Sequence, residues 1–240
     1  MKLMVLTCGV FPSEAEARRK MWIFLASCKK FGIEPHIYGM GDAWTIYRDI
    51  KINKQLAYLK ANHGNYTHVL YTDGWDSFFT GSLSEITHKY EKLGSPNSLV
   101  SACCQLGNVS RMEPYQGVFD ETERYRYPCV GGHISKIDYI VAIFERMLQN
   151  PAPTSDDCFD FYGAIQEGWF RPSLDSACEI FQVTDDNVVA TRTQDLSVRL
   201  FNIHTGCEPC ILHLSGGFCH QSHGKDPFMV PWAQKLGIIE

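Results

Sequence analysis

Apolar residues recur along the first hundred residues in two patterns, one typical of buried strands and one typical of helices. The runs LMVLT and HVLYT are continuous and rich in β-branched and aromatic residues, which favours strands buried on both faces. Ser13–Phe31 carries apolar residues at helical spacing, with Ser13 and Glu16 in a capping-box pattern and Gly32 as its stop. The pattern predicts these elements in order: strand Lys2–Thr7, helix Ser13–Phe31, strand Glu34–Tyr38, helix Ile46–Ala61, strand His68–Thr72, helix Leu83–Leu93 and strand Ser98–Cys104. This alternation predicts an α/β fold with a mainly parallel sheet covered by helices.

The second half of the chain is less regular. Met112–Tyr127 is aromatic and charged without a clear period, which predicts a long loop. The remaining pattern predicts a glycine turn, two helices and four short strands: turn Val130–Gly132, helices Ser135–Gln149 and Asp156–Glu167, and strands Glu179–Val183, Val188–Arg192, Ser197–Ile203 and Cys210–Leu214. No internal repeat, low-complexity tract or flexible linker divides the sequence, so we expect residues 1–240 to form one domain.

The composition predicts a large core and narrows the class of protein. Hydrophobic residues make up 45% of the chain and aromatic residues 12%, which excludes a disordered protein. A net charge of −5 gives no overall attraction to nucleic acid or to an anionic membrane. The opening MKLMVLTCGVF has too short an apolar core for a secretory signal, and no cleavage site follows it. We therefore expect a cytoplasmic protein without a membrane span, whose ten cysteines stay reduced.

Two carboxylates follow the run HVLYT directly. Asp73 and Asp76 are separated by Gly74 and Trp75, so they lie where a buried strand ends. The C-terminal ends of strands are where α/β sheets bind ligands. Paired carboxylates bind a divalent cation with open positions for diphosphate oxygens, and such a cation neutralises the charge on a departing nucleotide. The motif thus predicts a metal-dependent nucleotide-sugar transferase, with a solvated surface turn as the structural alternative.

The segment PCILHLSGG is a second candidate. A buried strand reaches His213, whose imidazole suits a third metal ligand. The glycines that begin at Gly216 let the backbone approach phosphate oxygens, and Lys225 adds a point charge for the same diphosphate. A structural histidine at a strand end is the alternative for His213 taken alone.

Two further pairs have both a structural and a functional interpretation. Asp156 and Asp157 begin a predicted helix, where the helix dipole favours acidic residues whether or not they are catalytic. In the functional interpretation one of them is a general base or an anchor for an acceptor hydroxyl. Gly131 and Gly132 form either an ordinary turn or a place where a sugar lies against the backbone.

Taken in order, the motifs DGWD, YPCVGGHIS, DDCFDFY, LDSACEIFQ and ILHLSGG resemble the glycosyltransferase domain of procollagen lysyl hydroxylases and the related collagen glycosyltransferases. The likeness extends from about Lys2 to about Gly237. It implies a GT-A fold, Rossmann-like with a mixed and mainly parallel sheet. It also implies a manganese-dependent, hexosyltransferase-like enzyme that uses a UDP-sugar.

The resemblance also implies roles for individual residues. It implies that Asp73, Asp76 and His213 bind the metal ion. It implies that Thr7 and Cys8 lie near the nucleotide base, and that Lys51 lines the nucleotide pocket. Asp156 and Asp157 would lie near the acceptor and the donor sugar, and Gly131 and Gly132 correspond to the family's glycine pair. Cys129 and Val130 stand where the family has Asn-Ser, a change that would remove a polar contact to the donor sugar. The acceptor stays open between a glycan, a protein hydroxyl and a modified nucleic-acid base, and we expect loop Met112–Arg126 to bind it.

Three other interpretations remain open. A zinc site would draw its ligands from one C-terminal set: Cys207, Cys210, Cys219, His220 and His223. A non-catalytic sugar-nucleotide-binding module would keep the same acidic residues without turnover. A metal-dependent nucleotidyltransferase also uses paired carboxylates, but TCGVFPSEAEARR has one glycine and lacks the Gly-rich phosphate loop usual in that class.

Overall fold

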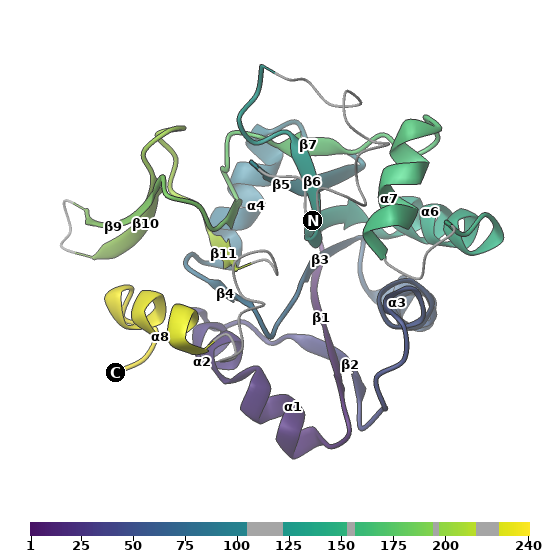
Figure 1. Ribbon diagram of the computed structural model, residues 1–240, viewed down its shortest axis with the longest axis horizontal. Coiled ribbons are helices and arrows are strands. Elements are labelled where there is room, and N and C mark those ends of the chain that lie inside the picture. Colours follow the sequence, from purple (N-terminus) through teal and green to yellow (C-terminus); the bar gives the residue numbers. More distant parts are fainter. Residues whose placement is uncertain (105–121, 153–156, 194–196, 215–225) are drawn as a thin grey trace.

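A six-stranded central sheet organises the computed structural model, which describes residues 1–104, 122–152, 157–193, 197–214 and 226–240 (Figure 1). The strand order is β2-β1-β3-β6-β5-β7. The strands are β1 (Leu3–Phe11), β2 (His36–Met40), β3 (His68–Thr72), β5 (Ser98–Cys103), β6 (Tyr127–Lys136) and β7 (Ser173–Asp175). Only β6 runs against the other strands of this sheet, because it pairs antiparallel with both β3 and β5. The predicted mixed, mainly parallel α/β fold is confirmed.

Two smaller sheets flank the central one. The first has the order β4-β11-β8 and consists of β4 (Ser77–Phe79), β11 (Ile211–His213) and β8 (Phe181–Val183). The second is an antiparallel pair, β9 (Val188–Arg192) and β10 (Val198–Asn202), which extends away from the central sheet in Figure 1.

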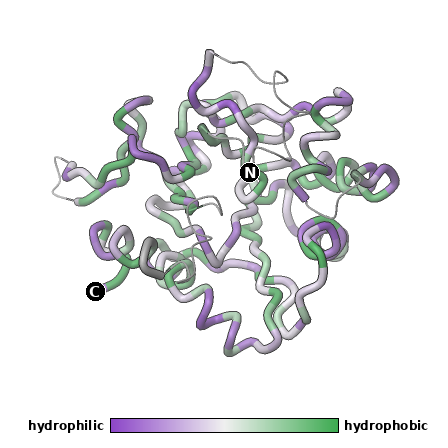
Figure 2. The backbone as a smooth tube through the Cα atoms, in the orientation of Figure 1, coloured by the Kyte–Doolittle hydropathy of each residue, from purple (hydrophilic) through white to green (hydrophobic). Residues whose placement is uncertain are grey.

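The helices lie on both faces of the central sheet. They are α1 (Glu14–Lys20), α2 (Trp22–Phe31), the π-helix η1 (Arg48–Lys54), α3 (Gln55–Asn62), the 3₁₀ turn η2 (His63–Asn65), α4 (Leu83–Lys92), α6 (Ile137–Gln149), α7 (Asp157–Gln166) and α8 (Asp226–Lys235). Figure 2 shows hydrophilic residues along α1, at the edge of the molecule, whereas the central strands are mostly hydrophobic. Within the described residues, no helix is both long enough and apolar enough to cross a bilayer.

The continuous apolar run of β3 is explained by burial on both faces. Val69 and Tyr71 pack into a core cluster with η1, α3, α6 and α7. Leu70, which points the opposite way, packs into a second cluster with α2 and α4. β1 alternates between the same two clusters. A strand covered by helices on both faces needs apolar residues at every position, as the sequence indicated.

Two of the predicted helices differ from the structure in detail. The predicted helix Ser13–Phe31 divides at Met21 into α1 and α2, with Ser13 as the N-cap and Gly32 in the left-handed conformation as the C-cap. The predicted helix Ile46–Ala61 begins as the π-helix η1. The three-residue strands β4 and β7 were not predicted. Residues 112–121, most of the predicted loop Met112–Tyr127, lie outside the described part of the chain.

The predicted turn Val130–Gly132 is wrong, because these residues lie inside β6. The pairing of β5 with β6 jumps from Val100 opposite His133 to Ser101 opposite Cys129. The glycine pair therefore occupies an irregular stretch of the β5–β6 ladder. Glycines inside a strand commonly mark such irregularities or a close approach by another group, and both conditions hold here.

Candidate active site

Two carboxylates and an imidazole converge at the C-terminal end of β3. Asp73 follows β3 directly, Asp76 precedes β4, and His213 is the last residue of β11. All three are buried, and one ligand atom from each lies within 4.8 Å of the other two. His213 Nε2 is 3.4 Å from Asp76 Oδ1. The structure thus brings together the three side chains that the sequence singled out as metal ligands.

The turn after β3 is held by backbone and hydroxyl contacts that fix Asp73. The Asp73 N–H donates to the Gly131 carbonyl at 3.0 Å, and the Ser77 hydroxyl donates to the Asp73 carbonyl at 2.6 Å. The Gly74 N–H donates to Thr7 Oγ1 at 2.8 Å. A Cβ on Gly74 would lie 2.7 Å from that same oxygen, so the turn requires a glycine. Thr7 therefore supports the turn, and its fully buried hydroxyl is not part of the pocket lining.

Asp76 and His213 are set side by side by the three-stranded sheet. The Leu214 N–H donates to the Asp76 carbonyl at 2.8 Å, which fixes the residue after His213 against the residue before β4. On the other side, the Thr184 N–H donates to the His213 carbonyl at 2.9 Å. Burial would lower the pKa of His213, but Cys129 and Asp76 raise it well above its ordinary value. In the absence of a cation, the raised pKa favours a protonated His213 ring beside the Asp76 carboxylate.

The two glycines of β6 make room for side chains from the small sheet. A Cβ on Gly131 would collide with Cε1 of His213 and lie 2.8 Å from Asp73 Oδ2. A Cβ on Gly132 would lie 2.9 Å from the ring of Phe181. Gly131 therefore keeps open the space between the candidate ligands Asp73 and His213. The predicted turn at this position did not indicate that role.

Lys51 is the cation nearest to this cluster among the described ion pairs. Its Nζ lies 2.6 Å from Asp73 Oδ2 and 3.7 Å from Asp157 Oδ2. Burial alone would lower the pKa of Lys51, but Asp73 and Asp157 outweigh burial and raise it well above the ordinary value. Arg48 Nε donates to Asp160 Oδ2 at 2.7 Å and so ties η1 to α7, which brings Lys51 and Asp157 together. The chain thus supplies a fixed positive charge between two buried carboxylates.

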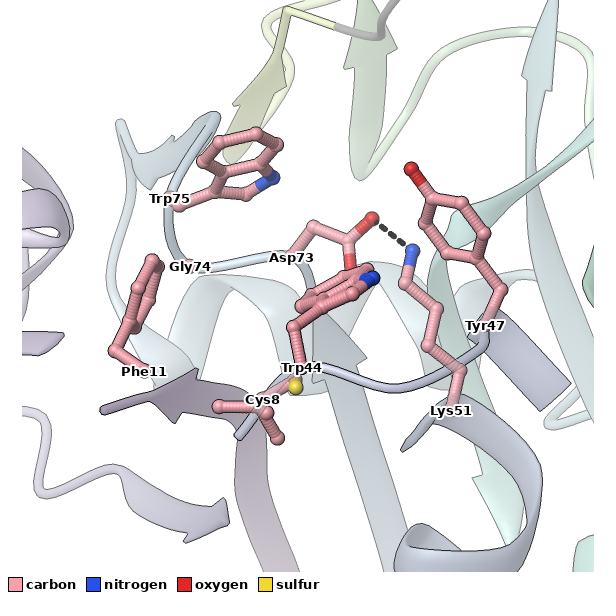
Figure 3. A pocket seen from close by; sticks show the side chains of 9 residues that line it. Cys8, Phe11, Trp44, Tyr47, Lys51, Asp73, Gly74 and Trp75 are labelled. Atoms are coloured by element: carbon pink, nitrogen blue, oxygen red, sulfur yellow. Dashed lines mark hydrogen bonds and ion pairs between the residues drawn. The ribbon is translucent and has the colours of Figure 1, made fainter. Parts of the chain in front are cut away.

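A pocket of about 250 Å³ opens beside Asp73 (Figure 3). Its lining consists of Cys8, Val10, Phe11, Trp44, Tyr47, Lys51, Asp73, Gly74 and Trp75. Trp44 and Trp75 are 49% and 41% exposed, so large aromatic faces are available to a ligand. Burial raises the pKa of the Cys8 thiol to about 11, so it lines the pocket as a neutral group. The sequence indicated Cys8, Lys51 and Asp73 but missed the aromatic lining, whose only local signal was the tryptophan inside DGWD.

Several residues singled out from the sequence lie outside the described part of the chain. They are Asp156, Gly216, Lys225, Cys219, His220 and His223. Of the described zinc candidates, Cys210 is fully buried with Lys89 Nζ 3.4 Å from its sulfur, and burial raises the pKa of this thiol to about 12. The sulfur of Cys207 contacts the Thr205 carbonyl at 3.8 Å. Within the described residues, Asp73, Asp76 and His213 form the group of three potential metal ligands, and no such group contains a cysteine.

The fold and this cluster define a class, a GT-A-like α/β domain with a candidate metal site at the C-terminal edge of its sheet. The family model of the PLOD GT domain matches residues 2–221, and this chain belongs to that glycosyltransferase family. The resemblance drawn from the sequence is therefore confirmed.

Two solved structures align with this chain by fold. The fold is similar to that of a glycosyltransferase involved in the glycosylation of the major capsid of PBCV-1. The TM-score is 0.54 at 13% identity, over 90% of this chain and 95% of that one. A 4-diphosphocytidyl-2C-methyl-D-erythritol synthase from Anaerococcus prevotii DSM 20548 aligns with a TM-score of 0.41 at 13% identity, over 72% of this chain and 87% of that one. No curated protein matches the chain.

Proposed function

We propose that this protein is a metal-dependent glycosyltransferase that transfers a sugar from a UDP-sugar to a hydroxyl acceptor. One observation carries the proposal. Asp73 belongs both to a buried group of three potential ligands and to the lining of an aromatic pocket large enough for part of a nucleotide. Membership of a glycosyltransferase family supports the same reaction class.

The donor atoms of the site suit a divalent cation such as Mn²⁺. Asp73 and Asp76 offer carboxylate oxygens and His213 offers an imidazole nitrogen, a mixed set suited to a first-row divalent metal. Gly131 leaves space between Asp73 and His213 that any side chain would fill. When bound, the cation would supply charge neutralisation for the leaving diphosphate.

The pocket residues would bind the nucleotide part of the donor. Trp44 and Trp75 present exposed indole faces next to Asp73, and aromatic stacking of a base contributes about 1–3 kcal/mol. Lys51 lies at the boundary between the pocket and the carboxylates, where its charge would contact the diphosphate. We also assign the diphosphate to Gly216 and Lys225, as the sequence pattern indicates.

We propose that Asp157 either accepts the proton of the acceptor hydroxyl or anchors that hydroxyl. Asp156 precedes it in the sequence and is the second candidate for this role. Asp157 is buried, and its Oδ2 lies 3.7 Å from the same Lys51 Nζ that contacts Asp73 at 2.6 Å. Asp157→Asn should therefore lower kcat more than it raises the KM for the donor. An equal loss of donor binding in steady-state kinetics would move Asp157 to the nucleotide site. Cytoplasmic location and an acceptor among glycans, protein hydroxyls or modified bases complete the proposal.

A thermal-shift panel of UDP-sugars with and without Mn²⁺ tests the function. A donor together with Mn²⁺ should raise the Tm more than the sum of the two separate shifts, since Asp73, Asp76 and His213 would hold a cation that strengthens donor binding. Asp76→Asn should remove this synergy, whereas Asp42→Asn, which affects a half-buried pair with Lys54 away from the cluster, should retain it. No Mn²⁺-dependent shift with any UDP-sugar would refute the proposal.

A further inference from the structure

Cys129 touches the candidate ligand His213 from the side opposite the cluster. Its sulfur lies 3.4 Å from His213 Nδ1, while Nε2 of the same ring is 3.4 Å from Asp76 Oδ1. Cys129 is half-buried on β6, two residues before Gly131, so one short stretch of strand provides both the space beside His213 and a contact to it. Cys129 is also a position at which this chain departs from the family pattern.

The chemistry of a ligand histidine gives this contact a meaning. A neutral imidazole has one N–H, so a ring that offers the Nε2 lone pair to a cation must carry its hydrogen on Nδ1. In a buried site that N–H needs an acceptor, and metal-binding histidines as a rule donate it to a neighbouring group. Of the described contacts to Nδ1, the sulfur of Cys129 is the one within hydrogen-bonding distance.

We propose that Cys129 is a positioning residue that accepts a hydrogen bond from His213 Nδ1–H and thereby presents Nε2 to the cation. The inference rests on the proposed metal-dependent function. It assigns a role to a thiol that neither binds the cation itself nor belongs to the apolar core. It also makes metal affinity depend on a sulfur atom that is not part of the donor pocket lining.

The test compares three variants of the full-length chain by calorimetric titration with Mn²⁺. Cys129→Val keeps a similar volume but removes the acceptor, and it should weaken Mn²⁺ binding about 10- to 100-fold. Cys129→Ser keeps an acceptor and should stay within about threefold of the unmodified protein. The control is Cys207→Ala, another half-buried cysteine, whose sulfur contacts a carbonyl on the β10 side of the molecule; its affinity should not change.

The outcomes separate this inference from the proposed function. If the unmodified protein binds Mn²⁺ and Cys129→Val binds it equally well, the positioning role is wrong and the metal site stands. If the unmodified protein binds no divalent cation, both proposals fall. A purely structural role would lower the Tm of metal-free Cys129→Val without the selective loss of Mn²⁺ affinity, and would also overturn the inference.

A second measurement needs no change at Cys129. In the Cd²⁺-loaded protein with ¹⁵N-labelled histidine, the His213 signals are assigned by their loss in His213→Gln. We expect a protonated Nδ1 and a metal-bound Nε2. A metal-bound Nδ1 would be incompatible with a hydrogen bond to Cys129.

Discussion

Asp73 and Asp76 belong to two differently built halves of one site. In the central-sheet half, defined here as Asp73, Tyr71 and Lys51, the carboxylate already has a lysine at 2.6 Å and accepts a hydrogen bond from the Tyr71 hydroxyl at 2.7 Å. In the small-sheet half, defined as Asp76 and His213, an acid and an imidazole face each other at 3.4 Å. In the first half, the permanent positive charge of Lys51 neutralises Asp73. In the second half, the partner of Asp76 is the His213 imidazole, which can give up its proton.

This difference predicts different responses to change. Loss of charge in the central-sheet half leaves a buried ammonium with fewer partners, so it should affect folding stability. A substitution that moves Asp76 or His213 in the small-sheet half should weaken cation binding and change the free energy of unfolding little. Four further experiments test this division: the first two have large expected effects of similar size, and the effects of the last two are smaller.

Gly131→Ala should have the largest effect on cation binding, because it acts where the two halves meet. The new Cβ would collide with His213 and lie 2.8 Å from Asp73 Oδ2, so one ligand must move. We expect Mn²⁺ affinity to fall by roughly 100-fold, the upper end of what loss of an outer partner costs a metal site. Calorimetric titration measures this loss. Gly64→Ala is the matched control, since nothing lies within 4 Å of its Cβ position, and affinity equal to that of Gly64→Ala would contradict the assigned role.

Asp73→Asn should lower stability even without metal. Lys51 would keep Asp157 at 3.7 Å but lose its closest partner. Removing one member of a buried pair should cost about 3 kcal/mol in the free energy of unfolding. Urea unfolding in the presence of a chelator gives the value. The comparison is Asp42→Asn, whose pair with Lys54 is more exposed than that of Lys51 with Asp73 and should contribute less than about 1 kcal/mol. Equal losses in the two variants would mean that the central-sheet half is not held by its ion pair.

The two halves also differ in how well the sequence predicted them. The strand HVLYT and the carboxylates after it are local information, and β3 has the predicted bounds, His68–Thr72. The small-sheet half depends on pairing between β4 and β11, which are far apart in the sequence, and His213 was found through its motif and the family resemblance. Two adjacent glycines usually mark a turn, so the sequence predicts a turn at Gly131 and Gly132. Their place in a strand is decided by non-local pairing with β3 and β5.

The aromatic pocket shows a further limit of local patterns. Trp44 precedes η1 and Trp75 follows β3, and neither segment has a periodic pattern that indicates a shared pocket. They meet because η1 packs beside β1 and β3, in the cluster that contains Ile52 and Val69. Such contacts between distant segments are set by tertiary packing, which no window of sequence contains.

Trp75→Ala tests whether the pocket belongs functionally to the central-sheet half. If the indole stacks on the donor's base, KM for the UDP-sugar should rise about 10-fold, within the 1–3 kcal/mol range for base stacking, with a smaller change in kcat. Steady-state kinetics at saturating Mn²⁺ separates the two constants. Trp22→Ala, on the outer side of α2 and 38% exposed, controls for loss of an indole. A fall in kcat alone would place Trp75 in the chemistry of transfer instead.

The smallest expected effect concerns acid sensitivity next to the central-sheet half. His133 of β6 is 2% exposed and stacks on Tyr71 with ring centroids 5.4 Å apart, and burial lowers its pKa to about 3. The unfolded chain takes up a proton on this residue near its ordinary pKa of about 6.5, whereas the folded protein does not. Neutral burial therefore costs nothing above that pH, and stability falls as the pH drops from about 6.5 towards 3, by at most about 1.4 kcal/mol per pH unit.

Urea unfolding at about pH 7 and pH 5.5 should show a loss of roughly 1 kcal/mol from this residue. His133→Gln should remove that part of the loss, while His63→Gln, at an exposed histidine, controls for the removal of an imidazole. An unchanged pH dependence in His133→Gln would show that the acid sensitivity originates elsewhere. If His133→Gln removes the pH dependence, the neutral His133 ring must stay packed on Tyr71, whose hydroxyl donates to Asp73. The stability of the central-sheet half would then require a neutral His133, a requirement that the small-sheet half does not share.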